Sequence, residues 1–443
     1  ADKVSYTLLP FSNSVYEPYI YEGLVGMLKI QEMADVEIDW QPILGSRDEQ
    51  PALYLAMLSS GNYPDVIQAQ HNNMYAGGVS QLYADGIILE LNDIIDQYMP
   101  NYKALLEAHP EVAKTLKDDE GRYLYFTVIN PGSTPDERVA FTWYGLQGRA
   151  DWMENVGIEE LPTTIDGWYE MLVAFRDLDP NGNGVQDEIP FDGGAAGYTY
   201  FMPAYDILNG AYIDPATGKV GIGEYTQNYK AFLETMNKWY SEGLVKDIWK
   251  DDGTMAGDEE KDANIYADLA GTWKGLSNYW EQRLPQVQEK NPNADFVAYG
   301  TDYNFSYGDR FTTVITVDCK NVEAAARLID TMFTEEGTNC TTWGIEEGDP
   351  ILTIPATEWT QGHGTYTVDE NGVKHETEWA NQMTENFYDG AFANKYRYAM
   401  SHVSFPRWGA GDYLASTREE HYVASAKLWG EASNALEYPA AIV

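Results

Sequence analysis

Short runs with the two-residue period of a β-strand alternate with amphipathic helical runs from the start of the chain. Strands are predicted over Lys3–Phe11, Val36–Ile43 and Pro64–Gln70, and helices over Glu17–Met33 and Gln50–Gly61. This β-α-β-α-β order favours an α/β domain built on a largely parallel sheet. Ligands of such sheets gather at the carboxyl ends of the strands, which directs attention to the residues that follow each predicted strand.

Length and charge limit the kind of protein that this can be. At 443 residues the chain is too long for one small core, so two domains are expected. It carries 28 basic against 70 acidic side chains, a formal net charge of −42. That field excludes nucleic acid as a partner and disfavours polyanionic ligands, while neutral ligands remain open. Aromatic residues make up 14% of the chain, which suits either a large core or the stacking surfaces of a carbohydrate site.

One acidic stretch, RDLDPNGNGVQDEIPF, matches the calcium-loop template D-x-D-x-N-G-x₅-E without a gap. Gly182 permits the sharp turn, and oxygen donors without His or Cys suit a hard cation. The predicted ligands are the side chains of Asp177, Asp179, Asn181 and Glu188 and the carbonyl oxygen of Asn183. A helix is expected to enter the loop, whereas Pro190 disfavours a helix leaving it. We therefore expect one structural Ca²⁺; the alternative is an acidic surface turn that binds no ion.

The cysteines and the first residues of the chain are relevant to the cellular compartment in which the protein works. Cys319 and Cys340 are the two cysteines, with a helical pattern between them, and either a disulfide or two free thiols fits. The sequence opens on Ala1 without an apolar leader, so we expect any export signal or lipid anchor to lie upstream.

Several segments resemble one family. SSGNYPDVI (59–67) is similar to a signature of the family 1 extracellular solute-binding proteins of carbohydrate ABC importers, and YADGIILELNDIIDQYMPN (83–101) to their next segment. The block from GRADW (148–152) through PTT to DPNGNGVQDEIP resembles the large lipoprotein branch of Gram-positive bacteria. The segments around 321–337 and 343–350 resemble a later helix and turn of that branch.

The resemblance implies an α/β, two-lobed fold of the periplasmic-binding-protein type, with crossing hinge strands and closure on the ligand. By analogy, lobe 1 comprises residues 1–126 and 300–342, and lobe 2 comprises 127–299 and 343–443 with the calcium loop. The chain would then cross near 125–130, 296–300 and 343–346. The implied protein is not an enzyme. It is an extracellular, lipid-tethered monomer that captures a neutral oligosaccharide and presents it to the membrane permease subunits of an ABC importer.

Candidate ligand residues combine aromatic platforms with polar side chains. Trp273 matches the position where the family presents a stacking Trp, after a strand predicted to begin near Asn264; packing between the domains is the alternative. The remaining candidates are Trp343, Trp408, Gln68, Gln70, His71, Asn72, Asn13, Ser14, Tyr198, Tyr200, Asp309 and Arg310. For the polar residues after the third strand, the alternative is loop capping.

Three alternatives to a transport function remain open. A secreted glycoside hydrolase needs two carboxylates roughly 5–10 Å apart across a sugar, and the abundance of acids is its only support. No HExxH, GxSxG, Walker-type or GxGxxG motif occurs in the sequence. A calcium-stabilised adhesin would show a shallow site without hinge motion, and a binding protein for a non-sugar ligand such as a peptide would share the fold.

Overall fold

The computed structural model describes most of the chain. The described residues are 1–9, 24–43, 45, 48–129, 144–207, 211–213, 219–247, 258–276, 280–299, 308–380 and 405–409.

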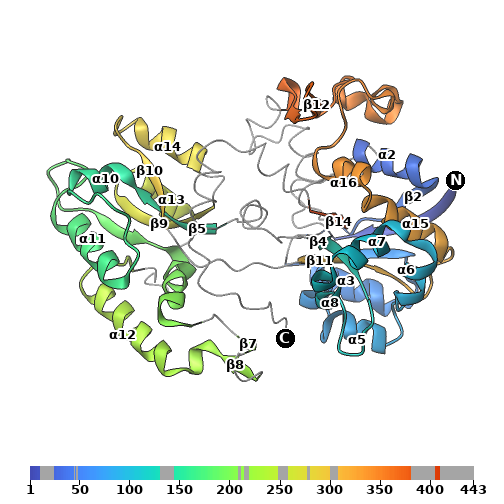
Figure 1. The fold of residues 1–443 in the computed structure, drawn as a ribbon, viewed down its shortest axis with the longest axis horizontal. Helices are drawn as coiled ribbons and strands as arrows, with labels where there is room; N and C mark the ends of the chain where they lie inside the picture. Colours follow the sequence, from blue (N-terminus) through green and yellow to red (C-terminus); the bar gives the residue numbers. More distant parts are fainter. Residues whose placement is uncertain are drawn as a thin grey trace. The chain divides into compact units, whose positions relative to one another are not determined.

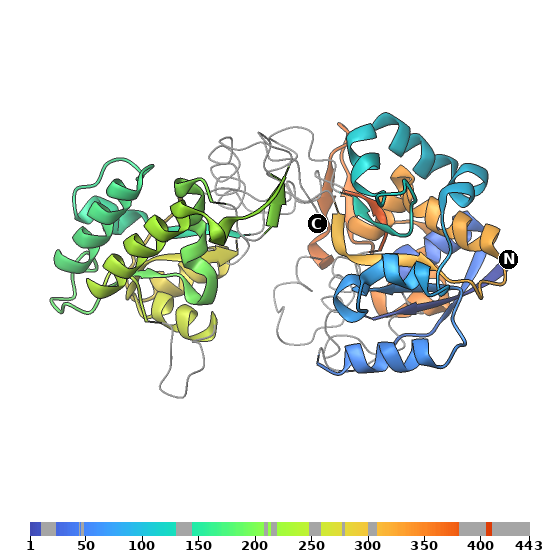
Figure 2. The same cartoon turned by 90° about the horizontal axis from the view of Figure 1, so that it is seen from below.

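The chain forms two compact units, each of which has its own sheet. Unit 1 comprises residues 1–131 and 306–417, and unit 2 comprises 132–305 and 418–443. In Figures 1 and 2 the blue and orange segments of the chain gather in one unit and the green and yellow segments in the other. This corrects the predicted boundaries, because residues 343–417 belong to the first unit. Ile345, Ile351 and Phe405 are buried in the same core as the first strand, and this contact holds the segment there.

Unit 1 contains a six-stranded sheet with the order β14-β4-β11-β3-β1-β2. β1 pairs in parallel with both β2 and β3, whereas β11 is antiparallel to β3 and β4. The strands are β1 (Asp2–Leu8), β2 (Val36–Trp40), β3 (Val66–Ala69), β4 (Phe126–Ile129), β11 (Gly308–Ile315) and β14 (Arg407–Trp408). The three strands predicted at the start of the chain are thus confirmed.

Helices cover both faces of this sheet, as expected for a parallel core. Side chains of one face, including Tyr6 and Val66, pack against α2, α6, α7 and α15. Side chains of the other face, including Ile67 and Val314, pack against α3 and α5. The helices are α2 (Val25–Ala34), α3 (Gln50–Ser59), α4 (His71–Met74), α5 (Gly78–Ala84), α6 (Asn92–Tyr98), α7 (Pro100–Ala108), α8 (Pro110–Thr115), α15 (Val322–Met332) and α16 (Glu335–Thr342).

Local sequence explains several elements of this unit. Asn321 Oδ1 accepts the Ala324 N–H at 3.0 Å and caps α15, whose apolar face is buried as its spacing predicts. The sequence Asn371-Gly372 is typical of a hairpin turn, and a hairpin is present as β12 (Tyr366–Val368) and β13 (Lys374–Glu376), in which Gly372 has φ +81°. Cys319 and Cys340 are free thiols, so the structure selects the second of the two alternatives.

The Asp65 carboxylate ties three segments of unit 1 together. Its Oδ2 accepts the backbone N–H of Ser5 and the Ser5 hydroxyl, both at 2.7 Å, and its Oδ1 accepts the Lys320 N–H at 2.8 Å. Burial by itself raises the pKa of Asp65, but the hydrogen bonds from Ser5 and Lys320 outweigh it and hold the pKa below its ordinary value. The carboxylate therefore joins β1, the start of β3 and the loop before α15.

Unit 2 contains a four-stranded sheet with the order β10-β5-β9-β6, in which only β6 and β9 are parallel. Its strands are β5 (Tyr144–Arg149), β6 (Ile189–Asp192), β9 (Ala270–Leu276) and β10 (Phe296–Tyr299). Its helices are α10 (Ala150–Asn155), α11 (Ile165–Asp177), α12 (Gln227–Ser241), α13 (Asp258–Tyr266) and α14 (Trp280–Gln288), with a 3₁₀ segment η1 (Gly194–Tyr205) and a small hairpin of β7 (Ala211–Ile213) and β8 (Val220–Ile222).

One prediction for unit 2 was wrong. Residues 264–273 were expected to form a strand that runs into a loop. Instead Asn264 lies in α13, the chain reverses at Asp268 with φ +64°, and the Gly-Thr-Trp sequence lies inside β9. The left-handed turn at an Asp, which tolerates positive φ better than most residues, separates the helix from the strand.

We expect Asp65→Ala to lower the free energy of unfolding at pH 7 by about 2–4 kcal/mol, because a buried charge and its hydrogen bonds are lost. The folded pKa is depressed, so the contribution is present above the unfolded pKa of about 3.9 and is lost as pH falls through the folded pKa. Urea unfolding of the wild type and of Asp65→Ala, measured from pH 7 down to acid pH, should show that the difference between their free energies of unfolding becomes smaller. Asp318→Ala is the control, since the exposed Asp318 accepts a hydrogen bond from the neighbouring Tyr63 N–H. Equal losses in the two variants would contradict the role of Asp65.

Candidate functional site

The acidic loop joins α11 to β6 in unit 2. Thr164 caps α11 by accepting the Gly167 N–H at 3.1 Å, and the helix buries Trp168, Leu172 and Phe175 along one side. The helix ends at Asp177, the first predicted ligand, and β6 begins one residue after Glu188, the last. The entering helix and the absence of a leaving one were both predicted, and both are confirmed in this described stretch.

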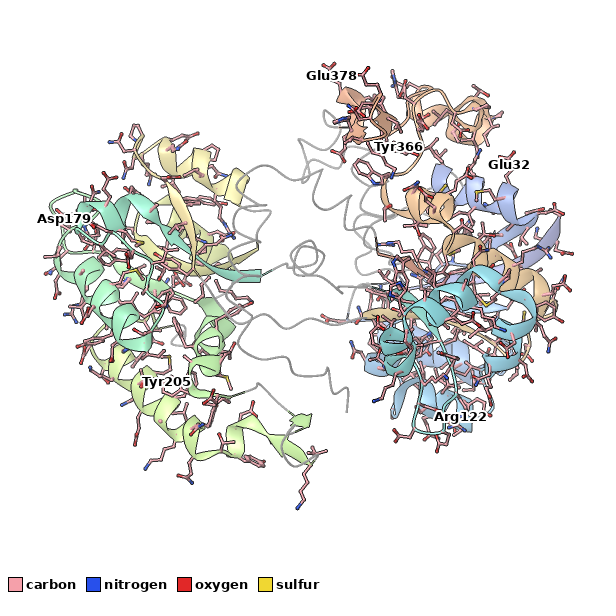
Figure 3. The ribbon with its side chains drawn as sticks, viewed as in Figure 1. Glu32, Arg122, Asp179, Tyr205, Tyr366 and Glu378 are labelled. Atoms are coloured by element: carbon pink, nitrogen blue, oxygen red, sulfur yellow. The ribbon has the colours of Figure 1, made fainter. Side chains whose placement is uncertain are left out.

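Backbone N–H groups converge on Asp179 within the loop. Its Oδ1 accepts the Asn183 N–H at 3.1 Å and its Oδ2 accepts the Gly184 N–H at 3.0 Å. Gly182 takes φ +71°, the turn that the template requires. Figure 3 labels Asp179 on this loop, beside the ribbon of α10 and α11. The loop is therefore curled so that the Asp179 and Asn181 side chains face its interior N–H groups.

Glu188 supplies the strongest sign that the loop suits a cation. Both of its carboxylate oxygens are buried, and neither has a hydrogen-bond partner. Burial raises the pKa of Glu188, and the negative charges of Asp179 and Asp187 raise it further, while the nearby backbone N–H groups of Glu188 and Asp187 oppose this; the net shift is upward. A carboxylate without a proton donor beside two like charges is costly unless a positive charge joins it.

The described donors fit a hard cation only in part. Arg176 Nε and Nη2 hold the Asp177 carboxylate at 2.7 and 2.9 Å, so a cation would share Asp177 with this guanidinium. Within the described part of the chain, no group of three or more His, Cys, Asp or Glu side chains lies close enough to hold a metal ion. The donor chemistry and the two unpartnered oxygens of Glu188 favour a hard cation.

Trp273 differs most from its predicted role as a stacking platform. It is 0% exposed in the middle of β9, where its Nε1 donates to Gln147 Oε1 at 3.1 Å. Its ring lies 4.9 Å from that of Phe296 in a small apolar core. A ring covered in this way cannot stack on a sugar without repacking, so the structure assigns Trp273 to the core of unit 2. Trp152 and Trp168 are also buried, in the larger core of unit 2.

The other two tryptophans predicted to be stacking platforms, Trp343 and Trp408, lie in unit 1. Trp343 is buried beside Tyr366, with ring centroids 5.8 Å apart, and does not lie at a crossing between the units. Trp408 is half-buried in β14, with its ring 4.6 Å from that of His109. Of the three predicted platforms, Trp408 alone keeps a partly exposed ring.

The polar residues in and after β3 mostly bond to the protein itself. Gln68 Oε1 accepts the Tyr6 hydroxyl at 2.7 Å, and Gln70 Oε1 accepts the Asn73 amide at 2.9 Å. His71 is buried with its Nδ1 2.6 Å from the Tyr54 hydroxyl, and burial lowers the pKa of His71 to about 4. It is therefore neutral at physiological pH.

Asn72 is exposed in α4, the short helix after β3, and its side chain binds the start of the next helix. Its Oδ1 accepts the Val79 N–H at the start of α5, at 3.1 Å. Loop capping, the alternative stated for this segment, describes the Asn72 contact.

The remaining candidates are scattered. Tyr198 is 38% exposed on η1, stacked 6.3 Å from Phe232, and Tyr200 packs partly buried against the unit 2 core. Asn13 and Ser14 lie outside the described residues. Asp309 and Arg310 lie in β11, and their side chains are outside the description.

Sequence reasoning missed Trp40, the last residue of β2. Its half-buried ring lies 5.4 Å from Tyr6 and 6.1 Å from Phe405. The rule that drew attention to the carboxyl ends of the first and third strands applies equally to the second, and would have found it.

The comparisons with known proteins agree with this fold. No protein-family model matches the chain. The fructooligosaccharide ABC transporter substrate-binding protein FusA of Streptococcus pneumoniae is 27% identical over 331 residues, which are 72% of this chain and 60% of FusA. The matched region thus spans less than two thirds of FusA.

Solved structures extend the likeness to nearly the whole chain. FusA in complex with kestose aligns with a TM-score of 0.65 at 20% identity, covering 96% of this chain and 82% of FusA. An extracellular solute-binding protein from Bifidobacterium longum subsp. infantis aligns with a TM-score of 0.71 at 18% identity, covering 98% and 82%. A further FusA structure is of an EF-hand mutant in complex with fructo-nystose.

The relatives and structural neighbours of the chain thus include a fructooligosaccharide-binding protein of an ABC transporter and other solute-binding proteins, and its fold is the two-lobed α/β fold of those proteins. Among the residues that the structure describes, no helix has the length and apolar character needed to cross a membrane.

We expect Trp273→Ala to lower the free energy of unfolding by about 3–5 kcal/mol, because it empties a packed site in the core of unit 2. Trp408→Ala should cost less, since that ring is already half-exposed. Urea unfolding followed by circular dichroism measures both. A stable Trp273→Ala protein that had lost glycan binding would restore the platform interpretation.

Proposed function

We propose that this chain is the substrate-binding protein of an ABC importer and that its ligand is a neutral oligosaccharide. The main support for this proposal is the 27% identity to FusA over 331 residues, together with a similarity in fold to FusA that covers 96% of this chain. Because the matched region covers 60% of FusA, the activity of the whole protein is a proposal. In this function no bond is broken: the ligand shifts the protein to a closed population that the permease accepts.

The charge of the chain supports a neutral ligand. A net charge of −42 repels a polyanionic glycan over the whole surface, and it does not oppose a neutral one. Among the aromatic candidates named above, Trp408 and Trp40 are partly exposed in unit 1 and Tyr198 is exposed in unit 2. We propose these rings as sugar contacts, because a flat ring matches the C–H face of a sugar.

The relatives also favour binding over catalysis. FusA is described as a substrate-binding protein, and the hydrolase alternative rests on nothing beyond the number of acidic residues. The proposed setting is extracellular, with a lipid anchor, a monomeric state and a membrane permease as partner, as expected of a protein that collects ligand for an importer.

We further propose that the acidic loop binds a structural Ca²⁺. Asp177, Asp179, Asn181, the Asn183 carbonyl and Glu188 would hold it, in the order of the calcium-loop template. The buried, unpartnered oxygens of Glu188 support this, and the EF-hand mutant of FusA indicates a loop of this kind in a relative. The ion would neutralise the carboxylates and fix the connection between α11 and β6.

A panel of neutral oligosaccharides, including fructooligosaccharides, should contain one class that raises the melting temperature of the protein in calcium buffer. At 100 times its dissociation constant such a ligand stabilises the protein by about 2.7 kcal/mol, enough to shift the melt. Acidic oligosaccharides and short peptides are the controls. Cleavage of the glycan would favour the hydrolase, and a shift with peptides alone would refute the carbohydrate proposal.

Calcium should raise the melting temperature of the wild-type protein, and Glu188→Gln should abolish that rise. At 1,000 times its dissociation constant the ion contributes about 4.1 kcal/mol. In excess chelator the variant should be at least as stable as wild type, because it no longer buries a carboxylate without a partner. Glu154→Gln, which removes an exposed acid of the same unit, should respond to calcium as wild type does. If calcium shifts Glu188→Gln fully, the loop is not the calcium site.

A further inference from the structure

A fully buried arginine lies where β5 meets α10 in unit 2. Arg149 is 0% exposed, and its Nε and Nη2 donate to the two carboxylate oxygens of Asp151 at 2.8 and 2.6 Å. Its Nη1 donates to the carboxylate of Asp268, in the turn between α13 and β9. Asp151 in turn accepts the Asp295 N–H at 3.2 Å, at the start of β10. One guanidinium therefore joins the beginnings of α10, β9 and β10.

The same Asp268 touches the acidic loop. Its backbone carbonyl accepts a hydrogen bond from Asn181 Nδ2 at 2.9 Å, while its side chain is held by Arg149. Asp268 has φ +64°, a left-handed conformation that costs energy for a residue with a side chain. The backbone hydrogen bonds from Asp268 N–H to Ile265 and from Leu269 N–H to Asn264, both at 3.0 Å, hold this turn, and the ion pair to Arg149 adds a contact through the side chain.

This hydrogen bond decides which way the Asn181 amide points. With Nδ2 held on Asp268, the Asn181 Oδ1 faces into the loop, where it accepts the Asn183 N–H at 3.0 Å. Asn181 occupies the fifth position of the template, where the side-chain oxygen faces the ion. Reversal of the amide would present its hydrogens to the ion instead.

Two more contacts join the loop to the same junction. Asn155, at the end of α10, donates through Nδ2 to the Pro180 carbonyl at 2.8 Å, and the Ile189 N–H donates to the Leu269 carbonyl at 2.8 Å. The loop is thus attached twice within its ligand positions and once after them, in each case to an element joined to Arg149.

We propose that the buried Arg149–Asp268 ion pair positions the calcium loop, by holding the Asp268 carbonyl that orients Asn181 toward the ion. The inference rests on the calcium site proposed above and adds two residues that the calcium-loop template does not contain. Neither residue touches the ion; both act through Asn181. Partners of this kind, which orient the ligands of a metal, typically change its affinity by about 10- to 100-fold when removed.

The chain contains a matched control for the test. Arg283 and Asp262 form a second ion pair in unit 2, with Nη2 and Oδ1 2.5 Å apart and an arginine side chain that is 2% exposed. Asp262 is 25% exposed and Asp268 14%, so Asp→Asn removes a similar charge at each position. Asn also tolerates the left-handed backbone of Asp268, so that variant keeps its turn.

The experiment compares the wild type, Asp268→Asn and Asp262→Asn in calcium titrations against a chromophoric chelator. Asp268→Asn should weaken calcium binding by about 10-fold or more, whereas Asp262→Asn should bind calcium as the wild type does. Urea unfolding in excess chelator should show that both variants fold and lose similar stability. Asp268→Gly, which keeps the turn and removes the whole side chain, should weaken calcium binding at least as much as Asp268→Asn.

A purely structural role for Asp268 predicts a different pattern. Asp268→Asn would then lose stability in chelator while its calcium dissociation constant matched that of wild type, and the inference would be overturned. The same weakening in Asp262→Asn would also overturn it, because the effect would not depend on the loop. A wild type that binds no calcium at all would refute the calcium proposal itself, which is a distinct result.

Discussion

With 70 acidic and 28 basic side chains, the chain lacks the cations to pair its carboxylates, and this shortage governs how both units are built. Several buried carboxylates are held by backbone N–H groups or by a shared arginine, whereas Asp192 has Lys246 as its cation. Asp65 accepts two backbone N–H groups and a hydroxyl, and Asp330 accepts N–H groups at the start of α7. Asp151 and Asp268 share one guanidinium, that of Arg149. The Glu188 oxygens have no such hydrogen-bond partner, which sets Glu188 apart from these four carboxylates.

Local patterns predicted those parts of the fold that local energetics decide. The early strands, α15 and the 366–376 hairpin each follow from periodicity, a cap or a turn residue. The failures occurred where distant contacts decide. Asp268 reverses the chain in a turn closed by its own N–H and that of Leu269, its carboxylate pairs with the distant Arg149, and no pattern near residue 268 indicates that pair. Likewise residues 343–417 belong to unit 1 because Ile345 and Phe405 join a core built by the first strands.

The same distinction separates the two candidate sites. All positions of a calcium loop lie within twelve consecutive residues, so the curl of the loop, its entering helix and the turn at its glycine could be predicted from the sequence. A glycan site is assembled from strand ends far apart in the chain, and aromatic residue type does not tell a platform from a core residue. Trp273 and Trp40 show both errors: the first was expected to be accessible and is buried, and the second was overlooked.

The chain returns to its first sheet after forming unit 2, and this affects the order in which the two sheets can form during synthesis. β11 lies between β3 and β4, and β14 pairs with β4, so the six-stranded sheet joins residues from both ends of the sequence with unit 2 inserted between them. A chain emerging from a ribosome or a translocon can complete the sheet of unit 2 while unit 1 still lacks two strands. Pairing across such a separation is slow, because a long loop must close first. Until then the strand edges of β3 and β4 stay open, and the excess of like charge helps to keep such half-made chains from associating.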